Sequence, residues 1–151
     1  MAPVDPRSAD PQATDAAGAD EPAYRGERLG LPPTGPGSMA GIWHRVLALA
    51  IDWLVCLIVA RVLVDDPQSA LASFATLGVF FVEVTVLTWL SGASFGQRLT
   101  GLRVVGRSRR LGLVGAALRT ALICVVIPPL VWDNDGRGLH DRAVDSVVVR
   151  A

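Results

Sequence analysis

The sequence predicts an all-α membrane protein with about three transmembrane helices, and it allows a short β-ribbon at the surface. Apolar residues make up 51% of the 151 residues and charged residues only 19%, with a mean hydropathy of +0.42. A soluble chain of this size has too small an interior to bury so many aliphatic side chains. The apolar residues also gather into three runs of 20 to 23 residues. About 20 residues are enough for a helix to cross a bilayer.

Residues 1–41 differ in composition from the rest, and we expect them to be a disordered acidic tail. They hold seven of the ten prolines and six of the 14 acidic residues, and they show no apolar periodicity. Such a segment cannot bury enough surface to order itself. It also lacks the apolar core of a cleavable secretory signal, so the first apolar run should act as an uncleaved anchor. Residues 42–150 are then one transmembrane domain.

The first apolar run, residues 42–64, should insert although it carries Arg45, Asp52 and Arg61. Its 13 large aliphatic residues together favour insertion by about 4 to 8 kcal/mol. One aspartate in the middle of a span costs about 2.5–3.5 kcal/mol, so insertion remains favourable. Arg61 lies at the far end of the run, where its side chain can snorkel to the headgroups.

Two more apolar runs follow. Residues 71–90 form the second, with Glu83 deep inside it. Residues 111–132 form the third, which contains Arg119 near its middle and a pair of prolines near its end. Because proline breaks or kinks a helix, the third run is the least secure of the three spans.

A basic loop, residues 91–110, separates the second and third runs and indicates the orientation. It contains five arginines and no acidic residue. The positive-inside rule therefore places this loop in the cytoplasm, and with it the N-terminus two spans earlier. Three complete crossings would put the C-terminus outside, whereas a third run that re-enters would leave it in the cytoplasm. The sequence leaves both topologies open.

Ionisable side chains inside the spans are the candidate functional groups, since a charge within the membrane is costly. Arg45 and Asp52 are seven residues apart, which puts them on one helix face about 10 Å apart along the axis. Glu83 and Arg119 have opposite charges and similar depths, so we expect either that facing helices bring them together or that the acids are neutralised. Such a set can be structural ion pairs, an ion or proton path, or a ligand site between helices.

Three segments in a fixed order carry a resemblance to a known family. The first is Arg45 followed by Ile51-Asp52, the second is residues 92–105, and the third is residues 139–149. Together they resemble the RDD family of small bacterial integral membrane proteins, over residues 38–150. The matching positions are Arg45, Asp52 and Asp141 for the family's Arg and two Asp, and Gly92, Ser94, Gly96, Gln97 and Arg98 in the loop.

The resemblance implies a multi-pass protein of the bacterial cell membrane. It also implies a role in transport, because a transport role has been suggested for the family and some members look like sodium/proton antiporters. The chain departs from the family at Val144-Asp145-Ser146, where Ala-Gly-Thr is often found, and in its short third apolar run. Both departures concern the C-terminal topology.

Local patterns add three expectations. Glycines 92, 96 and 101 suit either a sharp exit from the membrane with close backbone approach, or ordinary turns. Residues 102–105 and 147–149 are short β-prone runs that can pair into a ribbon if they lie on the same side of the membrane. Asp141 has three candidate partners, namely Arg142, a loop arginine or Arg45, and it can also be solvated.

Two functions from different classes follow. The first is a small transporter or transporter subunit, with Asp52 and Glu83 as ion or proton sites and Arg45 and Arg119 as counter-charges. The second is a non-transporting adaptor that uses the basic loop to bind lipid headgroups or a partner protein. We expect the lipid bilayer and a homo-oligomer or a membrane protein as partners, and no nucleic acid. We expect no cofactor, no metal and no enzymatic activity, since no nucleophile–base pair or metal-ligand spacing is found.

Overall fold

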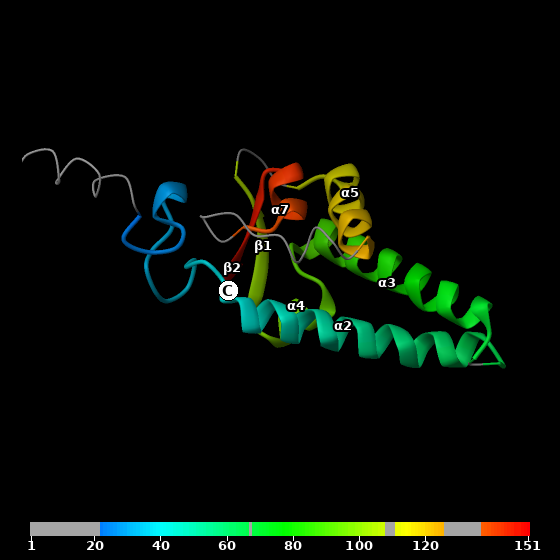
Figure 1. The fold of residues 1–151 in the computed structure, drawn as a ribbon. Helices are drawn as coiled ribbons and strands as arrows, with labels where there is room; N and C mark the ends of the chain where they lie inside the picture. Colours follow the sequence, from blue (N-terminus) through cyan, green and yellow to red (C-terminus); the bar gives the residue numbers. More distant parts are fainter. Residues whose placement is uncertain (1–21, 67, 108–110, 126–136) are drawn as a thin grey trace, which may run out of the picture.

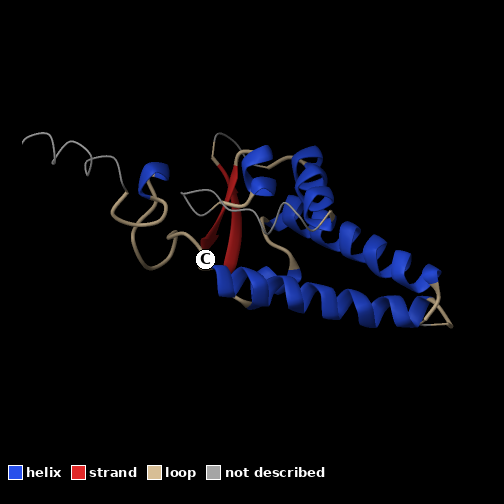
Figure 2. Ribbon diagram, viewed as in Figure 1, coloured by secondary structure: helices blue, strands red, loops and turns tan. Residues whose placement is uncertain are grey.

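The computed structural model describes residues 22–66, 68–107, 111–125 and 137–151. Its described part is mostly helical, with a small two-stranded sheet at one end (Figure 1). The elements in chain order are a 3-10 helix η1 (Glu27–Leu29), α2 (Ile42–Leu63), α3 (Ala70–Ser91), α4 (Phe95–Leu99), β1 (Leu102–Gly106), α5 (Leu113–Cys124), α7 (Leu139–Ala143) and β2 (Ser146–Arg150). Figure 2 shows that helices form the long part of the molecule and that the strands cross its end.

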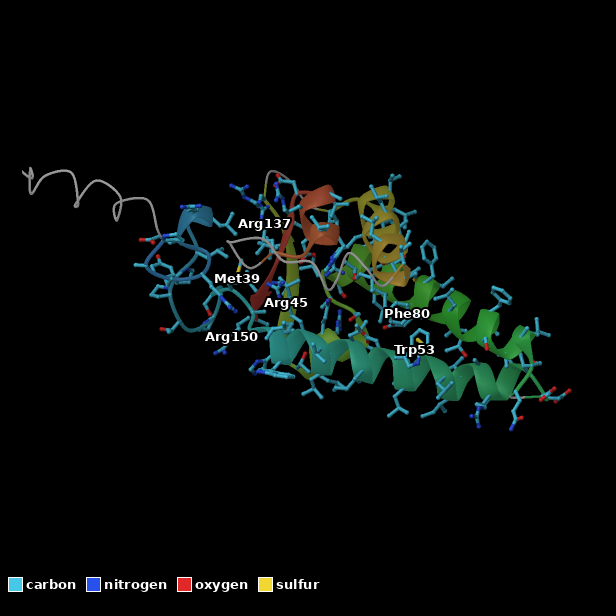
Figure 3. All side chains as sticks on the ribbon, in the orientation of Figure 1. Met39, Arg45, Trp53, Phe80, Arg137 and Arg150 are labelled. Carbon is cyan, nitrogen blue, oxygen red and sulfur yellow. The ribbon has the colours of Figure 1, made fainter. Side chains whose placement is uncertain are left out.

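Helices α2 and α3 form a long antiparallel hairpin, and they match the first two predicted spans. Each has 22 residues, and each is long and apolar enough to cross a membrane. The Ser69 hydroxyl caps α3 by accepting a hydrogen bond from the Ala72 amide at 3.2 Å. Trp53 of α2 packs against Phe80 of α3, with ring centroids 5.7 Å apart (Figure 3).

The buried face of the hairpin repeats every fourth residue on both helices. Its members are Ala48, Asp52, Cys56 and Ala60 on α2, and Ala72, Thr76, Phe80, Val84 and Thr88 on α3. Rows at a spacing of four are the ridges by which helices commonly interdigitate. Most of these side chains are small, and small residues let two helices in a membrane approach closely.

The large apolar side chains of the hairpin mostly point away from the protein. Trp43 is 79% exposed, Val62 83% and Phe74 72%, and only about a quarter of either helix is buried inside the protein. A helix in the core of a soluble protein would instead be mostly buried. The exposed apolar faces therefore need a covering that the described part of the chain does not provide.

The predicted ribbon is confirmed. Strand β1 pairs antiparallel with β2, with Val104 opposite Val148. Residues 38–40 lie along the other edge of β2, where the Ala40 amide donates to the Val148 carbonyl at 3.0 Å and the Arg150 amide to the Ser38 carbonyl at 2.9 Å. The sheet thus joins segments from before α2, after α3 and after α7.

The N-terminal tail differs from expectation in its second half. Residues 22–41 include η1 and the edge segment on β2, so they are hydrogen-bonded to the rest of the protein rather than a free tail. The apolar residues of the sequence gave no hint of this, because backbone pairing to β2 depends on register and not on side-chain periodicity. Residues 1–21 lie outside the described residues.

A third complete span is not confirmed. Helix α5 has 12 residues, which is about 18 Å of helix against a hydrocarbon core of about 30 Å. It packs against α3 and against α7. The predicted proline break lies outside the described residues. Strand β2 ends beside the start of α2 (Figure 1), so the two ends of the described chain lie at the same end of the hairpin.

Candidate functional site

Asp141 is the centre of a buried charge cluster drawn from three helices. The Arg119 Nε of α5 donates to Asp141 Oδ1 at 2.8 Å, and Nη1 of Arg45 on α2 lies 3.6 Å from Asp141 Oδ2. His140 Nε2 lies 3.5 Å from Oδ1. Asp141 has no exposed surface, and Arg119 is 2% exposed. The cluster therefore ties α2, α5 and α7 together in the interior.

Electrostatics keeps Asp141 ionised in this cluster. Burial by itself raises the pKa of the Asp141 carboxyl, but the nearby Arg119 outweighs this effect, together with His140 and Arg45, and the net result is a lowered pKa. A carboxylate held between two guanidinium groups is the form that these neighbours stabilise. Asp141 is thus a fixed anion of the site.

Arg45 also joins α2 to the sheet. Its Nη2 donates to the Val148 carbonyl of β2 at 3.2 Å, and the side chain rises from the start of α2 toward the strands (Figure 3). Of the partners that the sequence allows for Asp141, the structure selects Arg45, which is a confirmed contact, and it adds Arg119.

Asp52 anchors the short helix α4 to the middle of α2. Its two carboxylate oxygens accept hydrogen bonds from the Ser94 hydroxyl and from the Gly96 amide, each at 2.5 Å. Ser94 and Gln97 form a capping box at the start of α4, in which each side chain accepts from the other residue's amide. Asp52 is 3% exposed, so its carboxyl group has these donors as partners rather than bulk water.

Glu83 reaches the same short helix from the other side of the hairpin. Its Oε1 accepts from the Phe95 amide at 2.9 Å. The predicted pairing of Glu83 with Arg119 is therefore wrong, since the Arg119 Nε is used by Asp141. The physical reason is that α4 folds back between the two helices and offers its unpaired N-terminal amides to the acids there.

Two of the loop glycines have the special roles that the sequence allowed. Gly92 ends α3 in the left-handed region, at φ 76°, and lets the chain reverse. A Cβ on Gly96 would collide with the Ala48 carbonyl oxygen and would lie 2.9 Å from Asp52 Oδ1. Gly96 therefore permits α4 to pack directly on the α2 backbone. Arg98, the last residue of the loop motif, is exposed and lies outside this cluster.

A cavity of about 150 Å³ lies between these groups. Apolar side chains from α2, α3 and α5 form part of its wall, and its polar lining consists of Arg45, Asp52, Ser94, Gln97, Arg119 and His140. At about 30 Å³ per molecule, it has room for about five waters or for a small hydrated ion. The two motif residues Arg45 and Asp52 thus face one space, and Asp141 holds two of its lining residues.

The five candidate charges of the sequence analysis, all of them described residues, do not balance among themselves. Arg45 and Arg119 supply two positive charges, whereas Asp52, Glu83 and Asp141 supply three negative charges when all are ionised. An uncompensated charge in a low dielectric is costly. One proton, on a carboxyl or on His140, or one monovalent cation would neutralise the set.

His140 is the site residue that the sequence did not single out. It is 7% exposed and lines the cavity beside Asp141. A lone histidine in a polar tail gives no signal of this kind, and only the position of α7 over α5 brings it inside.

No group of three or more His, Cys, Asp or Glu residues suited to a metal ion occurs among the described residues.

No protein-family model matches the sequence, and no curated protein or solved structure shows detectable similarity to it. The assignment of function therefore rests on the geometry of the cavity and on the motif resemblance.

Proposed function

We propose that this chain is an integral membrane protein of the RDD type that moves a proton or a monovalent cation through the cavity between α2, α3, α5 and α7. The observation that carries the proposal is the cavity itself, because Arg45, Asp52, Arg119 and His140 line it between long apolar helices. Ionisable groups at such a depth are expensive to keep and commonly mark ion or proton pathways.

The exposed apolar faces of α2 and α3 support insertion in a bilayer. Trp43, Val62 and Phe74 are each more than two thirds exposed, and lipid would cover them at no cost in solvation. A second copy of the chain can cover part of the same surface. We propose such an oligomer, since two spans and a half-length helix enclose too little volume for a complete path.

The position of β2 supports a topology with two crossings. Strand β1 follows α3, β2 follows α7, and the two strands pair directly. Two paired strands must lie on the same side of a membrane, so the segment between them crosses an even number of times. We therefore propose that α5 enters the membrane without crossing it, and that the C-terminus lies in the cytoplasm with the basic loop.

A reporter fused after Ala151 tests this topology. We expect a green fluorescent protein fusion to fluoresce and an alkaline phosphatase fusion to be inactive, since both report a cytoplasmic end. The matched control is the same pair of reporters inserted after Asp66, in the turn between α2 and α3, where the opposite results are expected. Active phosphatase at Ala151 would mean that the chain crosses three times.

Asp52 is the proposed carrier carboxylate. Its partners are a hydroxyl and an amide, so no ion pair fixes its charge in the way that two arginines fix Asp141. A proton or a small cation in the cavity would meet the Asp52 carboxylate directly. Arg45 and Arg119 would supply the positive charges of the cavity lining. They would keep a bound anion separate from the cation at Asp52.

Flux through reconstituted protein tests the carrier. With Asp52→Asn, we expect proton flux driven by a sodium or potassium gradient to fall at least about tenfold. The reason is that the path loses a carboxylate that can accept and release a proton. Asparagine keeps an acceptor oxygen for the Gly96 amide, so α4 can stay in place. The matched control is Asp65→Asn, which neutralises an exposed acid in the turn. A pH-sensitive dye inside liposomes reports the flux.

Equal flux in the two variants would remove Asp52 from the mechanism. No flux from wild-type protein under any cation gradient would overturn transport altogether. The alternative would then be a membrane adaptor that uses its exposed arginines.

A further inference from the structure

The structure contains a second polar site, outside the charged cavity, at the end of α3. A groove of about 500 Å³ is lined by the last turn of α3, by Arg98 of α4 and by β1 from Arg103 to Gly106. We propose that this groove binds the phosphate of an anionic phospholipid such as phosphatidylglycerol. This inference requires insertion in a membrane but does not require transport.

The groove carries a positive charge that no acidic residue of its described wall compensates. Arg98 and Arg103 line it, and no acidic residue occurs among the described residues of its wall. Neither guanidinium has a hydrogen-bond or ion-pair partner within the described ranges. A guanidinium binds a phosphate through two parallel hydrogen bonds, which makes an arginine pair well suited to a phosphodiester.

The position of the groove selects a lipid as the source of the phosphate. It begins where the apolar helix α3 ends, and its wall includes Trp89 and Leu90, which are 45% and 65% exposed. Tryptophan is enriched at the level of the headgroups. Acyl chains can therefore lie along the exposed apolar face of α3 while the phosphate meets Arg98 and Arg103.

Spin-labelled lipids provide the test on full-length protein in bilayers. We expect wild-type protein to prefer phosphatidylglycerol over phosphatidylcholine by about tenfold or more, because each arginine at an anionic surface contributes about fivefold. Arg98→Gln with Arg103→Gln should reduce this preference to about twofold or less. The matched control is Arg61→Gln, which removes a charge in the last turn of α2, at the end of the hairpin away from the groove. This variant should keep most of the preference for phosphatidylglycerol.

Competition with inorganic phosphate shows whether the groove binds a lipid phosphate or free phosphate. If the groove is specific for a lipid, 10 mM inorganic phosphate should displace little of the labelled phosphatidylglycerol. Full displacement would mean a site for free phosphate and would overturn the lipid assignment. An equal preference in wild-type and the double variant would overturn the groove, as would failure of the protein to associate with bilayers. Loss of cation flux in the Asp52 variant has no bearing on this preference, so the two proposals fail separately.

Discussion

Replacing Gly96 by alanine is expected to lower the melting temperature by about 10 °C. The added Cβ would overlap the Ala48 carbonyl oxygen on α2 and would press on Asp52 Oδ1 at 2.9 Å. Overpacking of a closed contact costs about 1–3 kcal/mol, and here it also displaces the amide that Asp52 accepts. The two losses together correspond to about 3 kcal/mol, which in a domain of this size is a shift of about 10 °C.

Gly78→Ala is the matched control for Gly96→Ala. Gly78 lies within α3, and a Cβ there meets nothing within 4 Å. Alanine is the better helix former, so this variant should melt at the wild-type temperature or slightly above. Scanning fluorimetry in detergent compares the three proteins. Equal melting of the two variants would show that α4 does not pack on α2 at Gly96.

Replacing Asp141 by asparagine is expected to destabilise the protein by about 3–5 kcal/mol. The substitution keeps the shape of the side chain but leaves Arg119, which is 2% exposed, without its counter-charge. Removing one partner of a buried ion pair costs about this much, because the other charge remains buried. Denaturant unfolding in mixed micelles, followed by circular dichroism, measures the change.

Two further variants show whether the loss comes from the buried charge. Asp65→Asn neutralises an exposed acid in the turn between α2 and α3, and exposed substitutions of this kind change stability by about 0.5 kcal/mol or less. Asp141→Asn combined with Arg119→Met removes both charges of the Arg119–Asp141 pair, so it should recover part of the stability lost in Asp141→Asn. If Asp141→Asn were as stable as Asp65→Asn, Asp141 would not be the centre of the cluster.

The long helices and the ribbon could be predicted from sequence because each depends on a local pattern. Residues 42–64 and 71–90 are continuous apolar runs, and β-branched residues dominate 102–105 and 147–149. The boundary of the third helix could not be predicted, since the apolar run of the sequence continues past Cys124, the last residue of α5. Length and hydropathy alone do not report where a helix stops.

The members of the site other than His140 could be predicted, but of their pairings only the Arg45–Asp141 contact was among those that the sequence allowed. Arg45, Asp52, Glu83 and Arg119 were identifiable as charges in apolar runs, and Asp141 through the family resemblance. All five are engaged in buried or half-buried interactions. The pairing depends on α4 folding back to meet Asp52 and Glu83, which leaves Arg119 for Asp141. A five-residue helix has no periodicity long enough to signal such a fold.

The bond between Arg45 and the Val148 carbonyl joins residues 103 positions apart, and this has a consequence for biogenesis. During translation, α2 is made well before Asp141 and β2. Both of these partners lie within the last 11 residues of the sequence. The Arg45 guanidinium therefore reaches its native contacts only when synthesis of this sequence is almost finished, so the arrangement of the cluster must form late.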